Sequence, residues 1–207
     1  MFRFTGCKSN PCAKKIVSCP PMDFNHYITV AEFAPLAEFF RTEGHSRLFL
    51  PGELLARQDE HNPCCGLVES GAFRYVHLTA EGDAPVVGYS FSEEFVGDYI
   101  SMSNGQRSWV GIEAMCESRV WCLDYGRLAS FYAADAAHEQ LGRRLAEHLL
   151  AEVYERLLQC YVTSPQERYE ALLRRCPDLL NLVSLKELAS YLRVRPETLS
   201  RIRRRIR

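Results

Sequence analysis

The chain has 207 residues, 47% of them hydrophobic, and a formal net charge of −1 at pH 7. This length allows one medium domain and a small one, and the hydrophobic content is sufficient for packed cores. No stretch approaches the roughly 18 apolar residues of a membrane span, and the N-terminus lacks the apolar run of a secretory signal, so we expect a cytoplasmic protein with no membrane contact.

The first 22 residues form a lead rich in Cys, Lys and Pro. Nine cysteines in a reducing cytosol are more often buried thiols or metal ligands than disulfides. Four thiolates could hold an iron–sulfur cluster or zinc, although the lead lacks the two-residue gap that such groups usually show. The candidate ligands are Cys7, Cys12 and Cys19 with Cys116 or Cys122.

Residues 23–132 fit a sensor domain that is mostly β-structure. Residues 23–45 look helical, and short β-rich runs then alternate with turn signals such as Pro51-Gly52 and Ser70-Gly71. Regular short strands separated by glycine turns predict an antiparallel barrel or sandwich. The expected strands are 47–50, 66–69, 73–78, 86–91, 109–115 and 119–123.

Residues 133–162 predict one long helix with two adjacent apolar rows. A stripe of this width could seat the helix on the β domain and still face a second copy of the chain. The alternative is a plain core helix. The first row is Leu141, Leu145, Leu149, Val153, Leu157 and Tyr161, and the second is Ala146, Leu150, Tyr154 and Leu158.

Residues 163–207 predict a small helical domain that ends in a helix-turn-helix. Pro165 ends the long helix, and a short helix over 167–175 connects it to the helix-turn-helix. Ser184 with Glu187 matches a capping box, and Pro196 suits the first turn of a second helix. The turn is expected at Val194-Arg195, because the residue before a proline favours an extended conformation.

The second of these helices carries the charge that a DNA reader needs. Residues 184–207 hold eight basic and two acidic residues, a net charge of +6, so residues 1–183 sum to −7. A basic end on an acidic body would attract phosphates and make binding depend steeply on salt. The alternative is a solvated amphipathic helix with an arginine-rich tail.

A β-rich sensor, a long helix and a C-terminal helix-turn-helix, in that order, resemble the Crp/Fnr family of bacterial transcription regulators. The resemblance spans roughly residues 30–207 and is strongest at 189–202, where it is similar to the branch seen in Bacteroidetes-type bacteria. It implies an α+β fold: an antiparallel β-roll like that of cyclic nucleotide-binding domains, a long dimerisation helix and a helix-turn-helix. Many relatives continue into a final hairpin, and this sequence ends at Arg207.

The resemblance also implies site residues and partners. The partners would be double-stranded DNA with TTGA-like half-sites in an inverted repeat, a second copy of the chain, and RNA polymerase. Base contacts carry over to Glu197, Ser200 and Arg201, and phosphate contacts are expected from Arg195, Thr198, Arg203 and Arg204. A cyclic nucleotide would contact Gly97, Asp98, Arg107 and Ser108, and its phosphate would lie on the arginine and hydroxyl. Haem and iron–sulfur clusters are other effectors found among relatives.

We therefore expect a DNA-binding regulator controlled by a small molecule or a redox signal at the β-roll. An enzyme is not expected, because the sequence has no glycine-rich phosphate loop, no His-Glu-x-x-His and no Gly-x-Ser-x-Gly. The alternative is a cyclic-nucleotide or redox sensor whose helix-turn-helix serves mainly protein contacts.

Overall fold

The computed structural model describes residues 31–177 and 179–206. The cysteine-rich lead, with Cys7, Cys12 and Cys19, lies outside the described residues. The β-strands are β1 His45–Phe49, β2 Leu54–Ala56, β3 Cys64–Ser70, β4 Ala72–Val76, β5 Val86–Phe91, β6 Phe95–Val96, β7 Gly111–Ala114 and β8 Ser118–Asp124. The helices are a 3₁₀ turn η1 Ala31–Phe33, then α1 Ala34–Glu43, α2 Tyr99–Ser103, α3 Tyr125–Tyr132, α4 Ala136–Val162, α5 Pro165–Arg175, α6 Leu179–Leu182, α7 Leu185–Tyr191 and α8 Pro196–Ile206.

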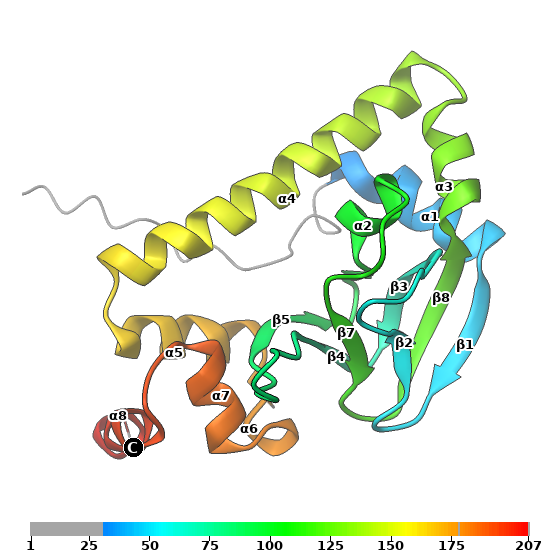
Figure 1. Ribbon diagram of the computed structural model, residues 1–207. Coiled ribbons are helices and arrows are strands. Elements are labelled where there is room, and N and C mark those ends of the chain that lie inside the picture. Colours follow the sequence, from blue (N-terminus) through cyan, green and yellow to red (C-terminus); the bar gives the residue numbers. More distant parts are fainter. Residues whose placement is uncertain (1–30, 178, 207) are drawn as a thin grey trace, which may run out of the picture.

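The strands form two four-stranded sheets in which every pairing is antiparallel (Figure 1). The first sheet has the order β1-β8-β3-β6, and the second has the order β2-β7-β4-β5. Apolar side chains of both sheets share one core, in which the Phe49 and Phe73 rings meet edge to face at 5.4 Å. The α+β fold with an N-terminal antiparallel β-roll, which the family resemblance implies, is confirmed.

The β3–β4 hairpin turns at a residue that must be glycine. Gly71 has a φ of +104°, and a Cβ there would lie 2.1 Å from the Ser118 hydroxyl oxygen. That hydroxyl instead accepts a hydrogen bond from the Ala72 N–H at 3.1 Å. The Ser70-Gly71 turn signal in the sequence therefore marks a real and tightly packed corner of the β-roll.

Helices α1, α3 and the first half of α4 cover the first sheet. Phe33, Leu36 and Phe40 are at most 2% exposed, and they pack with Leu123 of β8 and Leu145 of α4. These residues lie in the stretch 23–45 that the sequence predicts to be helical, of which the structure describes residues 31–45. Together they fix the start of α4 against the β-roll, so that its second half projects toward the C-terminal helices (Figure 1).

The long helix begins at Ala136, because the Asp135 side chain accepts hydrogen bonds from the N–H groups of Ala137 and His138. Its apolar stripe divides in two. Leu145 is buried. From residue 150 onward the large apolar side chains are exposed by 41–80%; they are Leu150, Val153, Tyr154, Leu157, Leu158, Tyr161 and Val162. We call this set the α4 apolar face.

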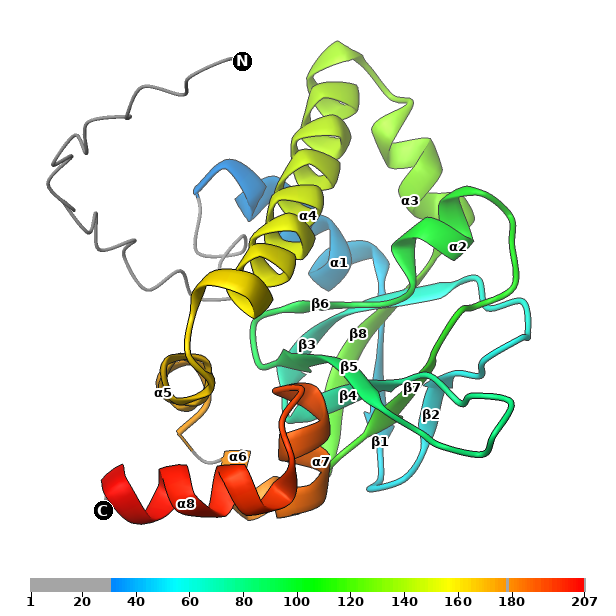
Figure 2. The same ribbon diagram turned by 60° about the vertical axis from the view of Figure 1, so that its left-hand side comes forward.

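Helices α5 to α8 form a second unit that packs against the β-roll. Its core is continuous with side chains of β4 and β5: Leu188 and Leu192 of the α7 segment share a cluster with Tyr89 and Phe91. In Figure 2, α7 lies between β5 and α8. Within the part of the chain that the structure describes, no helix has both the length and the apolar composition of a membrane span.

Candidate nucleic-acid interface and sensor pocket

The two final helices and the turn between them are fixed by local interactions. The Ser184 side chain accepts from the Glu187 N–H, and the Glu187 carboxylate accepts from the Ser184 N–H, which forms the predicted capping box. Arg193 in the turn has a φ of +53°, and its N–H donates to the Ser190 carbonyl. Helix α8 begins at Pro196, as the sequence predicts.

Helix α8 packs through one side and leaves the other open to solvent. Leu199 and Ile202 are buried in the core shared with α7. Glu197, Arg201 and Arg204 are exposed, and their spacing of four and three residues places them along one face. The structure thus brings the predicted base-contacting residues Glu197 and Arg201 together on an accessible helix.

The remaining predicted contact residues surround that face. Arg195 is exposed at the start of the helix, and Ser200, Thr198 and Arg203 are half-buried. The first turn of α8 is acidic and its last turn is basic. This order suits the helix dipole, which favours negative charge at the N-terminus and positive charge at the C-terminus.

Arg168 of α5 ties the helix-turn-helix to the end of α4. Its guanidinium donates to the carbonyl of Thr163 at 2.7 Å, to that of Gln159 at 3.3 Å and to that of Leu192 at 3.2 Å. The first two carbonyls lie at the C-terminus of α4, and the third lies at the end of α7. One side chain therefore links the long helix to the turn that orients α8.

A second set of contacts docks α7 on the β-roll. Arg74 of β4 pairs with Glu113 of β7 at 2.8 Å and also with the Glu187 carboxylate of α7. The Tyr89 and Tyr191 rings lie 4.8 Å apart. Glu187 thus serves both the capping box and the docking contact. Sequence reasoning missed this interface, because Arg74 and Glu187 are 113 positions apart.

These contacts set the ionisation of Glu187. Burial would raise the pKa of its carboxyl, but the Ser184 hydrogen bonds and the Arg74 charge more than offset that effect, so the pKa is lowered. Hydrogen bonds and a neighbouring cation both favour the charged form of a carboxyl. The docked arrangement therefore holds Glu187 as a carboxylate.

Among the predicted cyclic-nucleotide contacts, the Asp98 carboxylate is already occupied by hydrogen bonds from within the protein. Asp98 accepts from the Ser101 hydroxyl and N–H, from the Ser108 hydroxyl at 2.9 Å and from the Trp109 N–H at 2.8 Å. It thereby caps α2 and anchors the 108–109 segment. Arg107 is exposed and donates to the Asp59 carbonyl at 3.0 Å.

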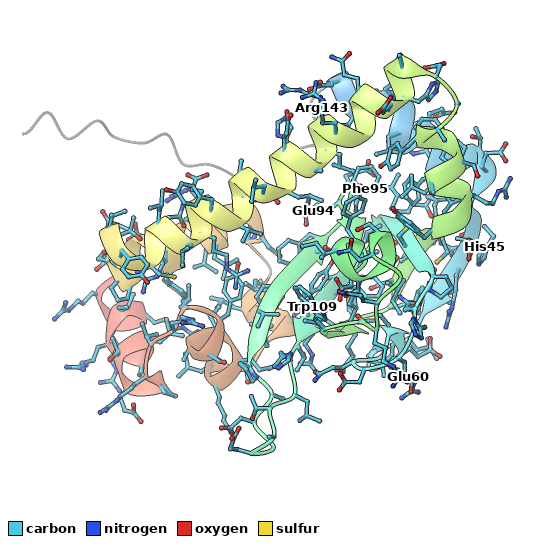
Figure 3. The ribbon with its side chains drawn as sticks, turned by 45° about the horizontal axis from the view of Figure 1, so that its top comes forward. His45, Glu60, Glu94, Phe95, Trp109 and Arg143 are labelled. Atoms are coloured by element: carbon cyan, nitrogen blue, oxygen red, sulfur yellow. The ribbon has the colours of Figure 1, made fainter. Side chains whose placement is uncertain are left out.

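A pocket of about 250 Å³ lies between the β-roll, α4 and α7. Figure 3 shows Phe95, one of its lining residues, beneath α4. Of the four predicted nucleotide contacts, Gly97 lines this pocket, and Asp98, Arg107 and Ser108 do not. The lining also includes Leu149 and Arg156 of α4 and Tyr191 of α7.

The described cysteines do not gather into a metal site. Cys116 is half-buried, and Cys122 is buried in the core between the sheets. Over residues 31–177 and 179–206, no group of three or more His, Cys, Asp and Glu side chains could hold an ion. The predicted cluster also needs Cys7, Cys12 and Cys19, which lie outside the described residues.

Comparisons with known proteins give matches to a domain family and to solved folds. The family model for the cyclic nucleotide-binding domain matches residues 46–135. The structure of FixK2 from Bradyrhizobium japonicum is 18% identical, with a TM-score of 0.64 over 79% of this chain and 84% of that chain. The c-di-GMP responsive global regulator CLP of Xanthomonas campestris is 20% identical, with a TM-score of 0.58 over 84% and 91%.

A transcriptional regulator of the CRP/FNR family from Thermus thermophilus is 18% identical, with a TM-score of 0.55 over 78% of this chain and 85% of that chain. A comparison with curated protein sequences gives no match. At these identities, the likeness to solved structures shows a shared fold.

The chain thus combines an antiparallel β-roll, a long helix and a C-terminal helix-turn-helix. Residues 46–135 match the model of the cyclic nucleotide-binding domain, and the chain shares its fold with Crp/Fnr transcription regulators of known structure. The resemblance seen in the sequence is confirmed at this level, and the Bacteroidetes-type branch stays a prediction.

Proposed function

We propose that this protein is a homodimeric, sequence-specific DNA-binding transcription regulator of the Crp/Fnr type that acts in the cytoplasm. The observation that carries the proposal is α8: an exposed, arginine-rich helix held by a capped partner helix and a tight turn. A second helix presented in this way can enter the major groove and contact base edges with its N-terminal residues.

Specific readout would come from three side chains on α8. Arg201 can donate two hydrogen bonds to guanine, and Glu197 can accept one from cytosine N4. Ser200 lies between them on the same face. Both pairings suit a TTGA-like half-site and its complement. Arg195, Thr198, Arg203 and Arg204 would contact phosphates and set the register on the duplex.

Dimerisation would use the α4 apolar face. Its seven large side chains are 41–80% exposed in a single chain, and a contiguous apolar surface of this kind marks an interaction site. A two-fold axis beside α4 would pair each of these side chains with the same face of the other copy. Two copies of α8 would then match the two halves of an inverted repeat.

The signal that controls DNA binding is proposed to act at the β-roll, as a small molecule or a redox change. Gly97, Asp98, Arg107 and Ser108 remain the proposed contacts for a cyclic nucleotide. Binding there would require Asp98 to exchange hydrogen bonds that it now receives from Ser108 and Trp109. Contact with RNA polymerase is proposed from the family resemblance alone.

Fluorescence anisotropy with a labelled duplex tests the function. The duplex carries an inverted repeat of TTGA half-sites, and a scrambled duplex measures non-specific binding. Arg201→Ala is expected to lose about 1–3 kcal/mol of discrimination per contacted base pair, roughly a 5- to 150-fold fall in the specificity ratio. Non-specific affinity should fall far less.

Arg57→Ala is the matched control, because it removes an exposed arginine from the sensor and so changes the net charge equally. It should leave the specificity ratio unchanged. If the wild-type chain binds both duplexes equally at every salt concentration, or if Arg201→Ala keeps full discrimination, the proposed reader is wrong. A salt slope near zero would instead favour a helix-turn-helix that serves protein contacts.

A further inference from the structure

Two of the described cysteines are neighbours on adjacent strands of the first sheet, where β3 pairs with β8 (Figure 1). In that pairing Cys64 lies opposite Asp124, and Cys122 lies opposite Gly66. Residues two apart on a strand point to the same face, so Cys64 and Cys122 are diagonal neighbours, and both pack in the core between the sheets. Cys65 points to the other face and packs with α1 and α3.

A hydrogen bond joins the Cys64 and Cys122 thiols and makes them chemically different. This bond lowers the pKa of the Cys64 thiol more than burial raises it, and the nearby Arg47 lowers that pKa further. The same bond, together with burial, raises the pKa of the Cys122 thiol. Because the thiolate is the reactive form of cysteine, Cys64 is the nucleophile of the pair and Cys122 is the thiol that keeps its proton.

Access from solvent separates the two thiols in the same order. Cys64 is half-buried, whereas Cys122 is 0% exposed. Cys64 is the first residue of β3, and its N–H donates to the Asn62 side chain at 3.3 Å in the loop before the strand. A small molecule therefore reaches Cys64 before Cys122. An accessible thiol of low pKa beside a second thiol is typical of a redox-reactive pair.

We propose that Cys64 reduces a hydroperoxide and then forms a disulfide with Cys122. The Cys64 thiolate attacks the peroxide and the O–O bond breaks. Cys64 becomes a sulfenic acid, and the released alkoxide or hydroxide takes a proton from the solvent. The Cys122 sulfur then attacks the Cys64 sulfur, and the sulfenic hydroxyl leaves as water with the Cys122 proton. The two thiols together lose the two electrons that reduce one peroxide.

The sheet register indicates that this disulfide is strained. Diagonal neighbours have Cβ atoms somewhat less than about 7–8 Å apart, whereas a disulfide requires about 3.5–4.5 Å. The start of β3 must therefore shift toward β8 when the bond closes. Strained disulfides have more oxidising potentials and are the labile ones, so the bond suits a reversible modification and not a structural link.

Oxidation of this pair would give a chemical form to the redox signal of the proposed function. That regulatory role rests on the proposed function, because it requires DNA binding. The reaction with peroxide and the disulfide do not depend on it.

Peptide mapping of the full chain tests the pair. The reduced protein is treated with an equimolar amount of hydrogen peroxide, free thiols are blocked with N-ethylmaleimide, and linked peptides are identified by mass spectrometry. We expect one dominant intrachain link, between the peptides that contain Cys64 and Cys122. Reduced glutathione added after the peroxide should remove that link, because the disulfide is strained.

Variants assign the bond, since Cys64 and Cys65 fall in the same peptide. Cys64→Ser should abolish the link, and Cys65→Ala should keep it. Cys122→Ala should abolish the link and leave a sulfenic acid on Cys64, which dimedone traps. If that variant does not fold, Cys64→Ser still identifies the reacting sulfur. Cys160→Ser, which changes an exposed cysteine of α4, is the matched control and should behave as the wild type does.

A link that persists in Cys64→Ser, or a Cys64 that is fully alkylated after peroxide treatment, would overturn the proposed pair. A bond that survives excess reduced glutathione would overturn its reversibility. The anisotropy assay on the reduced protein keeps the two proposals apart. A chain that forms the link but binds no DNA when reduced would leave the pair established and refute the proposed function instead.

Discussion

The Arg168 side chain connects the C-terminal end of α4 to the C-terminal end of α7. Its guanidinium donates to carbonyls at the end of α4 and at the end of α7, where the last carbonyls of a helix lack the regular intrahelical donors. The Arg156 guanidinium of α4, which lies 4.6 Å from the centre of the Tyr191 ring of α7, adds a second contact between these helix ends. Arg168 therefore helps to set the orientation of α8 relative to the long helix.

We expect Arg168→Ala to destabilise the C-terminal unit by about 1–3 kcal/mol, because it leaves helix-end carbonyls without a charged donor. Hydrogen exchange resolved by mass spectrometry would show faster exchange in α7 and α8 and unchanged exchange in the β-strands. Arg174→Ala, an exposed arginine of the same helix, is the control. Equal protection in both variants would contradict this role.

Interactions between residues that are close together in the sequence could be predicted. The Ser184–Glu187 capping box and the start of α8 at Pro196 were both predicted and both found, because their geometry depends on positions three residues apart. The bonds of Asp98 were not predictable in the same way. They depend on how closely the 108–109 segment approaches α2, which the whole β-roll decides.

The α4 helix is the element whose two halves face different surroundings. Leu145 is buried against α1 and α3, whereas Leu157 and Tyr161 are exposed. The width of the apolar stripe was predicted from the sequence. The place where it leaves the β-roll was not, since it depends on the size of the sheet below.

We expect Leu157→Glu to weaken the proposed dimer strongly, because a buried, unpaired carboxylate at a two-fold contact would be repelled by its own copy. Sedimentation equilibrium would report the loss as a shift toward monomer. Gln159→Glu adds the same charge two positions away, on the opposite side of the helix, and should leave the association constant unchanged. A wild-type chain that is monomeric at high concentration would refute the dimer.

Contacts between residues far apart in the sequence hold α7 against the β-roll. The pairing of Arg74 with Glu113 and Glu187 joins two strands of the β-roll to α7. Nothing in the local sequence marks Arg74 as a partner of α7, which is why the fold could be predicted and the docking could not. Mutational coupling data across the interface would be needed to find it.

The lowered pKa of Glu187 makes the docking depend on pH. Burial opposes the shift, but the Ser184 hydrogen bonds and the Arg74 charge hold the pKa of its carboxyl below the ordinary glutamate value, so the stability that Glu187 contributes is fully present above that ordinary value and is lost as pH falls through the lowered pKa. We expect the radius of gyration from small-angle scattering to increase in this acidic range, as the C-terminal unit moves away from the β-roll.

Glu187→Gln removes the titrating carboxyl and should lack that transition, while Glu197→Gln, which changes an exposed glutamate of α8, should keep it. Partners that face Glu187 are Arg74, Glu113 behind it and the Ser184 cap. If the increase in the radius of gyration at acidic pH persists in Glu187→Gln, another carboxyl causes it.

Glu187 makes two kinds of contact, and this limits which mutations can change the docking of α7 alone. The same carboxylate completes the cap of α7 and holds α7 to the β-roll, so any replacement that loosens the docking also weakens the reader. Arg74 carries no such second duty toward the helix. Variation that adjusts the balance between the docked and released forms should therefore accumulate on the β-roll side, at position 74 and its neighbour Glu113, while position 187 stays fixed.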